Sequence, residues 1–229
     1  MPNPDADAEV VATLADVAVD VERAPVLRGV DFILRAGESV GVVGANGSGK
    51  TTLLRVLATL LPPAHGNARV LGARLGTAAC FSVRPRIALV GHTSALYPRL
   101  TLRENLHFLA RLTGRPVWSA DEVLELVGLE RAADRRAEVC SHGMQRRTEL
   151  ARVLLLEPVL LLFDEAHTGL DSASAGLVEA VVNRVRARGG ASVVVSHEPG
   201  RLNHVCDRMV EIVGGRILAL PPARVEALA

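Results

Sequence analysis

The chain has 229 residues, enough for one large domain or a domain with a subdomain, and 49% of them are apolar, enough for a sizeable core. Its 26 basic and 25 acidic residues leave a formal net charge of +1, so the basic excess typical of a duplex-binding protein is missing and we expect no nucleic-acid partner. Aromatic residues make up only 3% of the chain, which also argues against stacking on single-stranded bases.

Nothing in the sequence indicates a membrane span or a secretory signal. The longest apolar stretch, residues 153–163, is interrupted by a glutamate and a proline and is shorter than the roughly 18 residues that suggest a span. The first residues carry acidic rather than basic side chains, unlike a signal peptide. Cys80, Cys140 and Cys206 match no disulfide or metal spacing, so we expect free thiols in a reducing, cytosolic compartment. Any role at a membrane would depend on a partner.

The first part of the chain has the pattern of short strands separated by turns. Apolar runs bounded by glycine and polar residues predict four strands, over residues 26–34, 39–43, 66–72 and 87–91. The strand over 39–43 leads directly into a glycine-rich segment, after which residues 50–61 predict a helix. This alternation indicates an α/β chain.

The middle of the chain changes to helical spacing. Residues 101–112 predict a helix that Thr101 caps, residues 120–129 a second helix and residues 131–136 a third. We therefore expect a mostly helical subdomain over about residues 92–147.

The α/β pattern then resumes. The remaining elements are a strand, a helix, a strand and a hairpin, predicted over residues 159–163, 172–188, 192–195 and 208–218. The first of these strands is continuously apolar, as in a sheet buried on both faces. We expect one domain over residues 8–229, in which the helical subdomain interrupts an α/β core of about residues 8–91 and 148–229.

A phosphate-binding loop is the strongest chemical signal in the sequence. The pattern GxxxxGK[ST] is matched by Gly44, Ala45, Asn46, Gly47, Ser48, Gly49, Lys50 and Thr51. Glycines let the backbone wrap a phosphate chain with its N–H groups pointing inward, and the helix that follows adds its positive end. Lys50 is placed to neutralise phosphate charge and the Thr51 hydroxyl to ligate Mg²⁺, while Thr52 continues the nucleotide-binding segment.

Two carboxylates follow the buried strand over residues 159–163. Asp164 and Glu165 would lie at the C-terminal edge of the sheet, where α/β folds place their ligands. Adjacent acids are costly there unless they have a role. Asp164 is placed to hold Mg²⁺ through its water shell, and Glu165 to polarise the attacking water as a general base. The alternative, a solvated strand end with two surface acids, is disfavoured by the phosphate loop upstream.

The class of nucleotide-binding protein follows from a segment just before this strand. A phosphate loop alone also occurs in GTPases, kinases and helicases, but the guanine signal NKxD is missing from this sequence. The run CSHGMQRR, residues 140–147, resembles the LSGGQ signature of ABC ATPases. Ser141 and Gly143 match the signature, whereas Cys140, His142 and Met144 depart from it. By itself this run also fits a plain helix N-cap.

Further residues stand where the ABC family has its other motifs, so that the resemblance covers roughly residues 12–218. Asp171, in the run TGLD, resembles the D-loop aspartate, and His197 follows a predicted strand as the family's switch histidine does. His92 stands where the family usually has the Q-loop glutamine, and Thr93 is the alternative occupant of that role. Each residue alone has a simpler explanation, such as a helix cap or a loop histidine. Their joint order carries the resemblance.

The resemblance implies a P-loop NTPase (ABC ATPase) fold with an N-terminal antiparallel β part and an inserted helical subdomain. It implies a homodimer or pseudo-dimer that clamps two ATP molecules, each with Mg²⁺, between the phosphate loop of one subunit and the signature of the other. The signature residues that would meet the partner's ATP are Ser141, His142, Gly143, Met144 and Gln145. His197 would contact the γ-phosphate and support the water that Glu165 activates. The chain would hydrolyse ATP at the cytoplasmic face of the cell membrane, bound to integral membrane transporter subunits.

The sequence lacks one feature of the family, the aromatic residue that stacks on the adenine base. The aromatic residue that stacks on the base should lie near residues 19–23, where this sequence has none. Arg23 is the candidate to lie over the base instead. A histidine at position 92 would also put a titratable group near the γ-phosphate.

Three kinds of machine fit these motifs. The pair GH at 91–92, with LT at 100–101 and ENLHF at 104–108, resembles the ATP-binding subunit of the haem exporter used in cytochrome c maturation, which we favour. GM at 143–144 and RR at 146–147 also resemble ATPases of drug, antibiotic or polysaccharide exporters. The third kind is a soluble ABC ATPase that assembles a cytosolic partner, such as the iron–sulfur assembly type.

Overall fold

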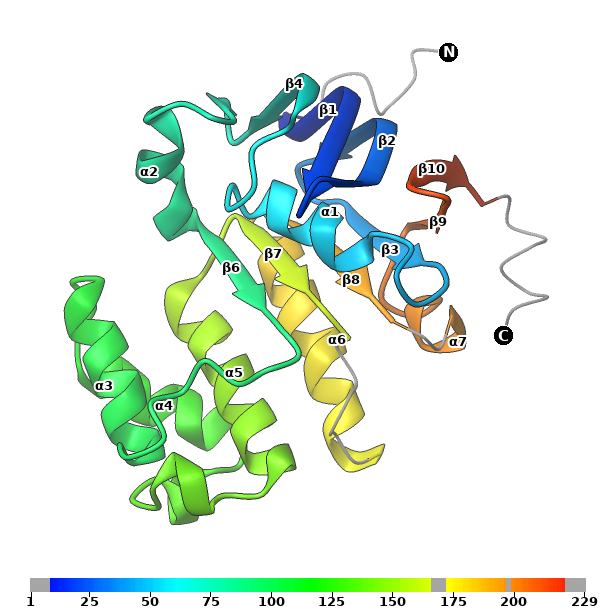
Figure 1. Ribbon diagram of the computed structural model, residues 1–229. Helices are drawn as coiled ribbons and strands as arrows, with labels where there is room; N and C mark the ends of the chain where they lie inside the picture. Colours follow the sequence, from blue (N-terminus) through cyan, green and yellow to red (C-terminus); the bar gives the residue numbers. More distant parts are fainter. Residues whose placement is uncertain (1–8, 166–171, 197–198, 221–229) are drawn as a thin grey trace, which may run out of the picture.

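Two β-sheets form the frame of the protein, of which the computed structural model describes residues 9–165, 172–196 and 199–220 (Figure 1). The first sheet is antiparallel throughout, in the order β2-β1-β4-β5. Its strands are β1 (Val10–Val21), β2 (Ala24–Arg35), β4 (His65–Val70) and β5 (Ala73–Arg74). Buried and less buried residues alternate along the second half of β2, as expected for a sheet with one face on the core.

The second sheet has six strands in the order β10-β9-β3-β8-β7-β6, and all neighbours except β10 and β9 run parallel. Its strands are β3 (Ser39–Val43), β6 (Ile87–Val90), β7 (Leu160–Phe163), β8 (Ala191–Val195), β9 (Arg208–Val213) and β10 (Arg216–Ala219). Every residue of β3, β7 and β8 is buried, and for β7 this confirms the predicted strand covered on both faces. The carboxyl ends of the parallel strands therefore meet at one edge, where ligands bind in folds of this class.

Helices cover both faces of the parallel sheet. Helix α1 (Lys50–Leu57) lies between the two sheets, and its buried side chains share one hydrophobic core with both of them (Figure 1). The opposite face packs on α5 (His142–Leu156) and α6 (Ser172–Ala187). Neighbouring residues of β8 divide between the two cores, because successive strand side chains point to opposite faces.

Helix α1 ends earlier than its sequence predicts. The apolar run suggested a helix to residue 61, but the helix stops at Leu57. Thr59 adopts a left-handed conformation (φ 60°), which interrupts the helical path. Arg84 holds this turn by donating from Nη2 to the Thr59 carbonyl at 2.9 Å.

A helical part extends below β6 in Figure 1 and has a core of its own. It contains α3 (Leu102–Leu112), α4 (Trp118–Leu126) and the apolar side of α5. The predicted cap of α3 is confirmed. The Thr101 hydroxyl accepts from Glu104 N at 3.0 Å, and Glu104 Oε2 accepts from Thr101 N at 2.8 Å, which is a reciprocal capping box.

The prediction of a third helix over residues 131–136 is wrong. The chain makes a 3₁₀ turn at Glu130–Ala132 and then extends to pair with the start of α3. The carbonyls of Ala133 and Arg135 accept the first-turn N–H groups of Arg103 and Leu102. This segment therefore satisfies donors that α3 leaves open at its N-terminus, and it cannot do so as a helix.

The other helices are short. They are α2 (Ala79–Val83), α7 (Pro199–Leu202) and 3₁₀ turns at Arg84–Arg86 and Ala137–Val139. Among the helices within the described residues, none has the length and apolar character needed to cross a membrane. Cys80, Cys140 and Cys206 are free.

Candidate nucleotide-binding site

The phosphate loop connects the end of β3 to the start of α1, and its backbone requires glycine. Gly44, Gly47 and Gly49 all have positive φ angles. A Cβ atom on Gly44 would lie 2.6 Å from the Ile212 carbonyl oxygen, and one on Gly49 would lie 2.8 Å from a methyl group of Leu27. Only glycine fits both the conformation and the space at these two positions.

Lys50, the first residue of α1, turns back over this loop. Its Nζ donates to the carbonyl oxygens of Gly44 at 2.7 Å and Ala45 at 2.9 Å, and the residue is buried. Burial lowers the pKa of Lys50, an effect that the nearby charges of Asp164 and Glu165 oppose. The loop thus holds a desolvated cation at the place where the sequence predicts phosphate.

A hollow of about 310 Å³ lies beside the loop and holds several of the predicted residues. It is lined by Val26, Asn46, Gly47, Gly49, Lys50, Thr51, Thr52, Asp164 and Glu165. The Oγ of Ser48, also in the loop, is buried without a hydrogen-bond partner in the described part of the chain. A glycine-rich backbone that can curve around a ligand, the buried cation of Lys50 and the unpaired Ser48 hydroxyl together suit a triphosphate chain.

The two main motifs meet in this hollow. Thr51 Oγ1 donates to Asp164 Oδ2 at 2.8 Å, although the residues are 113 positions apart in the sequence. A hydroxyl and a carboxylate are the kinds of oxygen ligand that Mg²⁺ takes in proteins. The residues present therefore fit a magnesium ion beside the phosphates.

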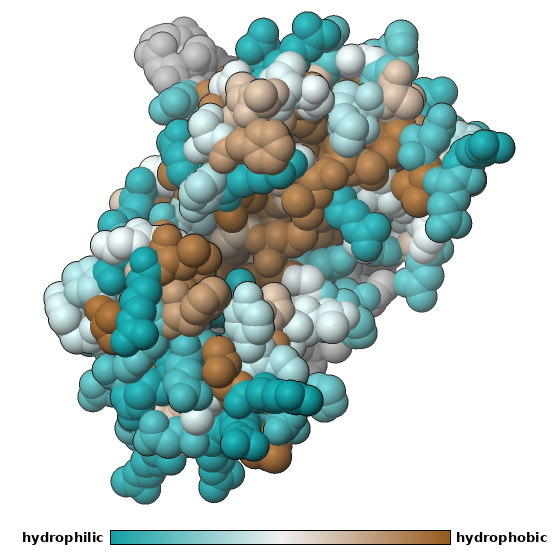
Figure 2. Space-filling model, turned by 60° about the vertical axis from the view of Figure 1, so that its left-hand side comes forward, coloured by the Kyte–Doolittle hydropathy of each residue, from teal (hydrophilic) through white to brown (hydrophobic). Residues whose placement is uncertain are grey.

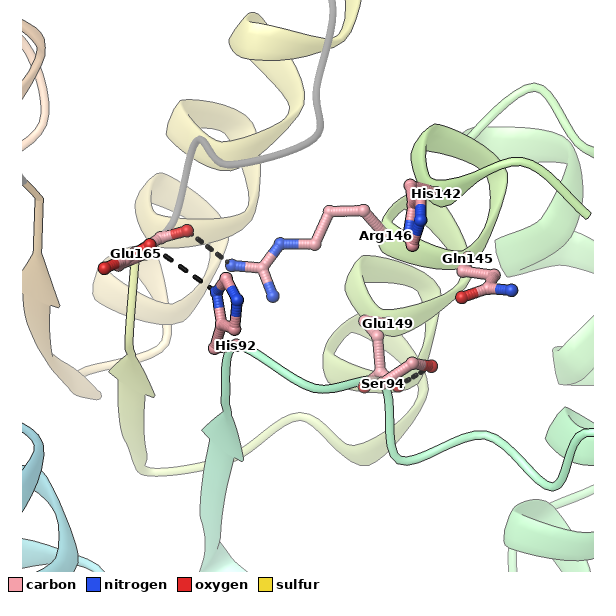
Figure 3. A pocket seen from close by; sticks show the side chains of 7 residues that line it. All are labelled: His92, Ser94, His142, Gln145, Arg146, Glu149 and Glu165. Atoms are coloured by element: carbon pink, nitrogen blue, oxygen red, sulfur yellow. Dashed lines mark hydrogen bonds and ion pairs between the residues drawn. The ribbon is translucent and has the colours of Figure 1, made fainter.

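Glu165 lies at the border between this hollow and a second one. Its backbone is left-handed, with φ 57°, which is unusual for a residue other than glycine. Its carboxylate Oε2 lies 3.5 Å from Nδ1 of His92, which follows β6 (Figure 3). The structure therefore brings His92 next to Glu165, while Thr93 is exposed on the same segment.

The signature run forms the start of α5. Ser141 is the N-cap of this helix, and its Oγ accepts from Met144 N at 3.3 Å, so the capping role considered for the sequence is present. Gln145 Nε2 donates to the Ala137 carbonyl at 2.8 Å. Ser141 and His142 are exposed. The described residues that line the phosphate-loop hollow include none from the signature.

Some predicted site residues are not placed and others were missed. Asp171 and His197 lie outside the described residues. Val26 lines the nucleotide hollow without having been predicted there. A second hollow of about 350 Å³, shown in Figure 3, is lined by His92, Ser94, His142, Gln145, Arg146, Glu149 and Glu165. His92, His142, Gln145 and Glu165 were predicted as site residues, whereas Ser94, Arg146 and Glu149 were not.

Comparison with known proteins agrees with this geometry. A family model described as ABC transporter matches residues 27–168. The chain is 37% identical over 194 residues to the cytochrome c biogenesis ATP-binding export protein CcmA 2 of Cupriavidus metallidurans, covering 83% of this chain and 91% of that protein. It is 39% identical over 210 residues to the lipoprotein-releasing system ATP-binding protein LolD of Anaeromyxobacter dehalogenans, covering 87% of each.

Another relative is longer than this chain. Identity to the linearmycin resistance ATP-binding protein LnrL of Bacillus subtilis is 34% over 199 residues, which is 85% of this chain. The aligned part spans 64% of LnrL, less than two thirds of its length.

Solved structures place the fold in the same group. An ATP-binding subunit of an ABC transporter superposes with a TM-score of 0.84 at 27% identity, covering 95% of this chain and 93% of that one. A dimeric bacterial ABC transporter cassette has a TM-score of 0.82 at 24% identity and shares the fold over 92% of this chain and 99% of its own. The predicted ABC ATPase fold and the resemblance to its family are thereby confirmed. The chain belongs to the ABC transporter family, and its fold is that of the ATP-binding domains of this family.

Proposed function

We propose that this chain drives a membrane exporter by hydrolysing ATP in the hollow between the phosphate loop and the end of β7. The observation that carries the proposal is the 2.8 Å contact from Thr51 to Asp164, because it joins the loop to the acidic strand end in one site. Lys50, held at the mouth of the loop by two carbonyls, would neutralise charge on the β- and γ-phosphates. Backbone N–H groups of residues 45–51 and the orphaned Ser48 hydroxyl would bind the phosphate oxygens.

Glu165 is our candidate for the general base. Its carboxylate would accept a proton from water as the water oxygen bonds to the γ-phosphorus and the bond to the β–γ bridging oxygen breaks, leaving ADP with the electron pair. Thr51 and Asp164 would hold a magnesium ion, which when bound offsets phosphate charge. His92 lies beside Glu165, and its position supports the Q-loop role. We retain His197 as a contact to the γ-phosphate and Asp171 as the D-loop residue.

A second copy, or a related ATPase domain, would complete the site. The phosphate loop covers a triphosphate from one side only, and the signature residues do not line the hollow of their own chain. Ser141 and His142 are exposed at the positive N-terminal end of α5, where an anion is stabilised. Two chains related by a twofold axis would place each signature, from Ser141 to Gln145, against the ATP of the other.

The membrane partner would dock beside α3. Figure 2 looks onto this side, where apolar side chains gather between the upper and lower parts of the molecule. Tyr97 and Phe108 make an edge-to-face pair with ring centroids 5.3 Å apart, yet they stay 54% and 45% exposed. Asn105 fixes the loop beneath them by accepting from Tyr97 N and donating to the Tyr97 carbonyl. A rigid exposed aromatic pair suits a helix from an integral membrane subunit, which would hold this chain at the cytoplasmic face.

Haem export in cytochrome c maturation is the transport that we favour. The support is the likeness to CcmA 2, which this chain covers over 91% of its length, together with the GH pair at 91–92. The alternative is an exporter of drugs, antibiotics or polysaccharides, supported by the likeness to the linearmycin resistance protein and by the GM and RR pairs near the signature. A soluble assembly ATPase remains the third candidate.

Lys50→Ala should weaken MgATP binding. A hydrogen bond to a charged group contributes about 1.5–3 kcal/mol, so we expect affinity to fall by at least about tenfold in calorimetry. Arg55→Ala, on the exposed side of the same helix, is the control and should bind as the wild type does. Unchanged affinity in Lys50→Ala would refute the assignment of this loop to phosphate.

Glu165→Gln should keep ATP binding but slow phosphate release by about 10²–10⁴, the usual contribution of a general base. Glu157→Gln is a matched control, because Glu157 is also a glutamate with a left-handed backbone but pairs with Arg115 and Arg188 at the far end of α5. We expect its turnover to stay within about twofold of the wild type. Near-normal turnover in Glu165→Gln would remove Glu165 from the role of base.

Tagged protein purified from native membranes in mild detergent should retain integral membrane proteins. Phe108→Asp should reduce this retention while ATPase activity persists. Leu126→Asp, at an exposed position on α4, is the control and should retain the membrane proteins as the wild type does. Partners that handle haem would support haem export, and permeases of other classes would support the alternative exporter. Recovery of soluble partners alone would contradict both.

A further inference from the structure

The second hollow contains a buried positive charge that the ATP site as described does not use. Arg146, on the second turn of α5, is only 8% exposed. Its Nη1 donates to the Gly91 carbonyl at 2.9 Å. Its Nη2 donates to the Glu165 carbonyl at 2.9 Å (Figure 3). Within the described residues no carboxylate forms an ion pair with it, and its Nε is buried without a partner.

Burying a guanidinium in this position costs free energy of folding. Desolvation by burial lowers the pKa of Arg146, and the nearby charges of Glu149, Asp164 and Glu165 offset this only in part. The ring of Phe163 lies 5.9 Å from the guanidinium carbon and gives some compensation. An apolar side chain of similar length would pack at this place without such a penalty, so stability alone does not account for the arginine.

The two acceptors of Arg146 indicate what it does. Gly91 lies between the end of β6 and His92, and Glu165, the proposed base, follows the end of β7. The planar side chain of Arg146 therefore links the segments that position His92 and Glu165. Glu165 also adopts a left-handed backbone, a strained conformation that persists only when its surroundings hold it. The bond from Arg146 to the Glu165 carbonyl is one such restraint.

One turn further along α5, Glu149 holds the rest of the same segment. Its Oε1 accepts from Ser94 Oγ at 3.1 Å and from Ala95 N at 2.8 Å, and it is also paired with Arg152. The helix that begins at Ser141 is therefore fastened to residues 91–95 at two points. Any displacement of α5 would be passed to the backbone of Glu165 through Arg146.

We propose that Arg146 is a positioning residue that sets the orientation of Glu165 and links it to the helix beginning at the signature. The proposal rests on Glu165 being the base of the proposed function. Arginine suits this position because the two Nη nitrogens of its planar fork each donate to one of the two carbonyl oxygens in a fixed geometry, whereas lysine has a single ammonium on a flexible stem.

The test compares Arg146→Lys and Arg146→Gln with Arg147→Lys. Arg147 is a matched control, because its guanidinium also contacts two backbone carbonyls, those of Val127 and Gly128, but on the side away from Glu165. Misplacing a catalytic group by about 1 Å can cost on the order of 10²-fold, so we expect both Arg146 variants to lose about 10- to 100-fold in kcat. Their MgATP affinity should stay within about twofold of the wild type, and Arg147→Lys should keep its kcat.

A double-mutant cycle separates positioning from general damage. If Arg146 acts through the Glu165 carboxylate, Arg146→Lys should have little further effect on the residual phosphate release of Glu165→Gln. Additive losses, or kcat unchanged in either folded Arg146 variant, would overturn the proposal. A loss of kcat accompanied by an equal loss of ATP affinity would also overturn it, because it would show collapse of the site. If the single variant Glu165→Gln kept its turnover, the assignment of Glu165 as base would be wrong, and the positioning proposal that rests on it would be wrong as well. If only the Arg146 variants kept theirs, the base assignment would stand and positioning alone would fail.

Discussion

The parallel pairing of β3, β8, β7 and β6 is the constraint on which the rest of the site depends. Because these strands run the same way, the phosphate loop, the Asp164–Glu165 pair and His92 all emerge at one edge of the sheet. Because every residue of β3, β7 and β8 is buried, a slip of one residue would exchange side chains between two packed cores, and this packing opposes it. The contact between Thr51 and Asp164 is the direct result of this pairing.

Several features that cost free energy of folding lie at the same edge. The loop needs three glycines with positive φ, Glu165 is left-handed, and two cations, Lys50 and Arg146, are buried. Such features persist only where a well-packed surrounding structure stabilises them, which here is supplied by the hydrophobic cores on both faces of the sheet. The two buried cations beside the glycine-rich loop support the interpretation of this edge as a preorganised site for phosphate transfer.

Much of this arrangement could be predicted from local patterns, and the rest depends on tertiary contacts. The phosphate loop could be predicted because a strand, glycines and a helix follow one another, and the acidic pair because it follows a continuously apolar strand. The cap at Thr101 could be predicted because a helix cap is a signal of only a few residues. Arg146 was missed as a buried link, because on sequence alone it belongs to a polar helix face. Its burial arises only when α5 packs against the ends of β6 and β7. The helix expected over residues 131–136 failed for the same kind of reason, since its carbonyls bind the start of α3.

We propose that this edge is half of a site that a second chain completes. The most direct measurement is the ATPase rate of a mixture of Ser141→Arg and Lys50→Ala chains, compared with each variant alone. A heterodimer has one intact pairing of phosphate loop and signature, so each variant alone should be nearly inactive, whereas the mixture should recover activity from one working site per heterodimer. Full activity in Ser141→Arg alone, or a mixture as inactive as its components, would contradict the account.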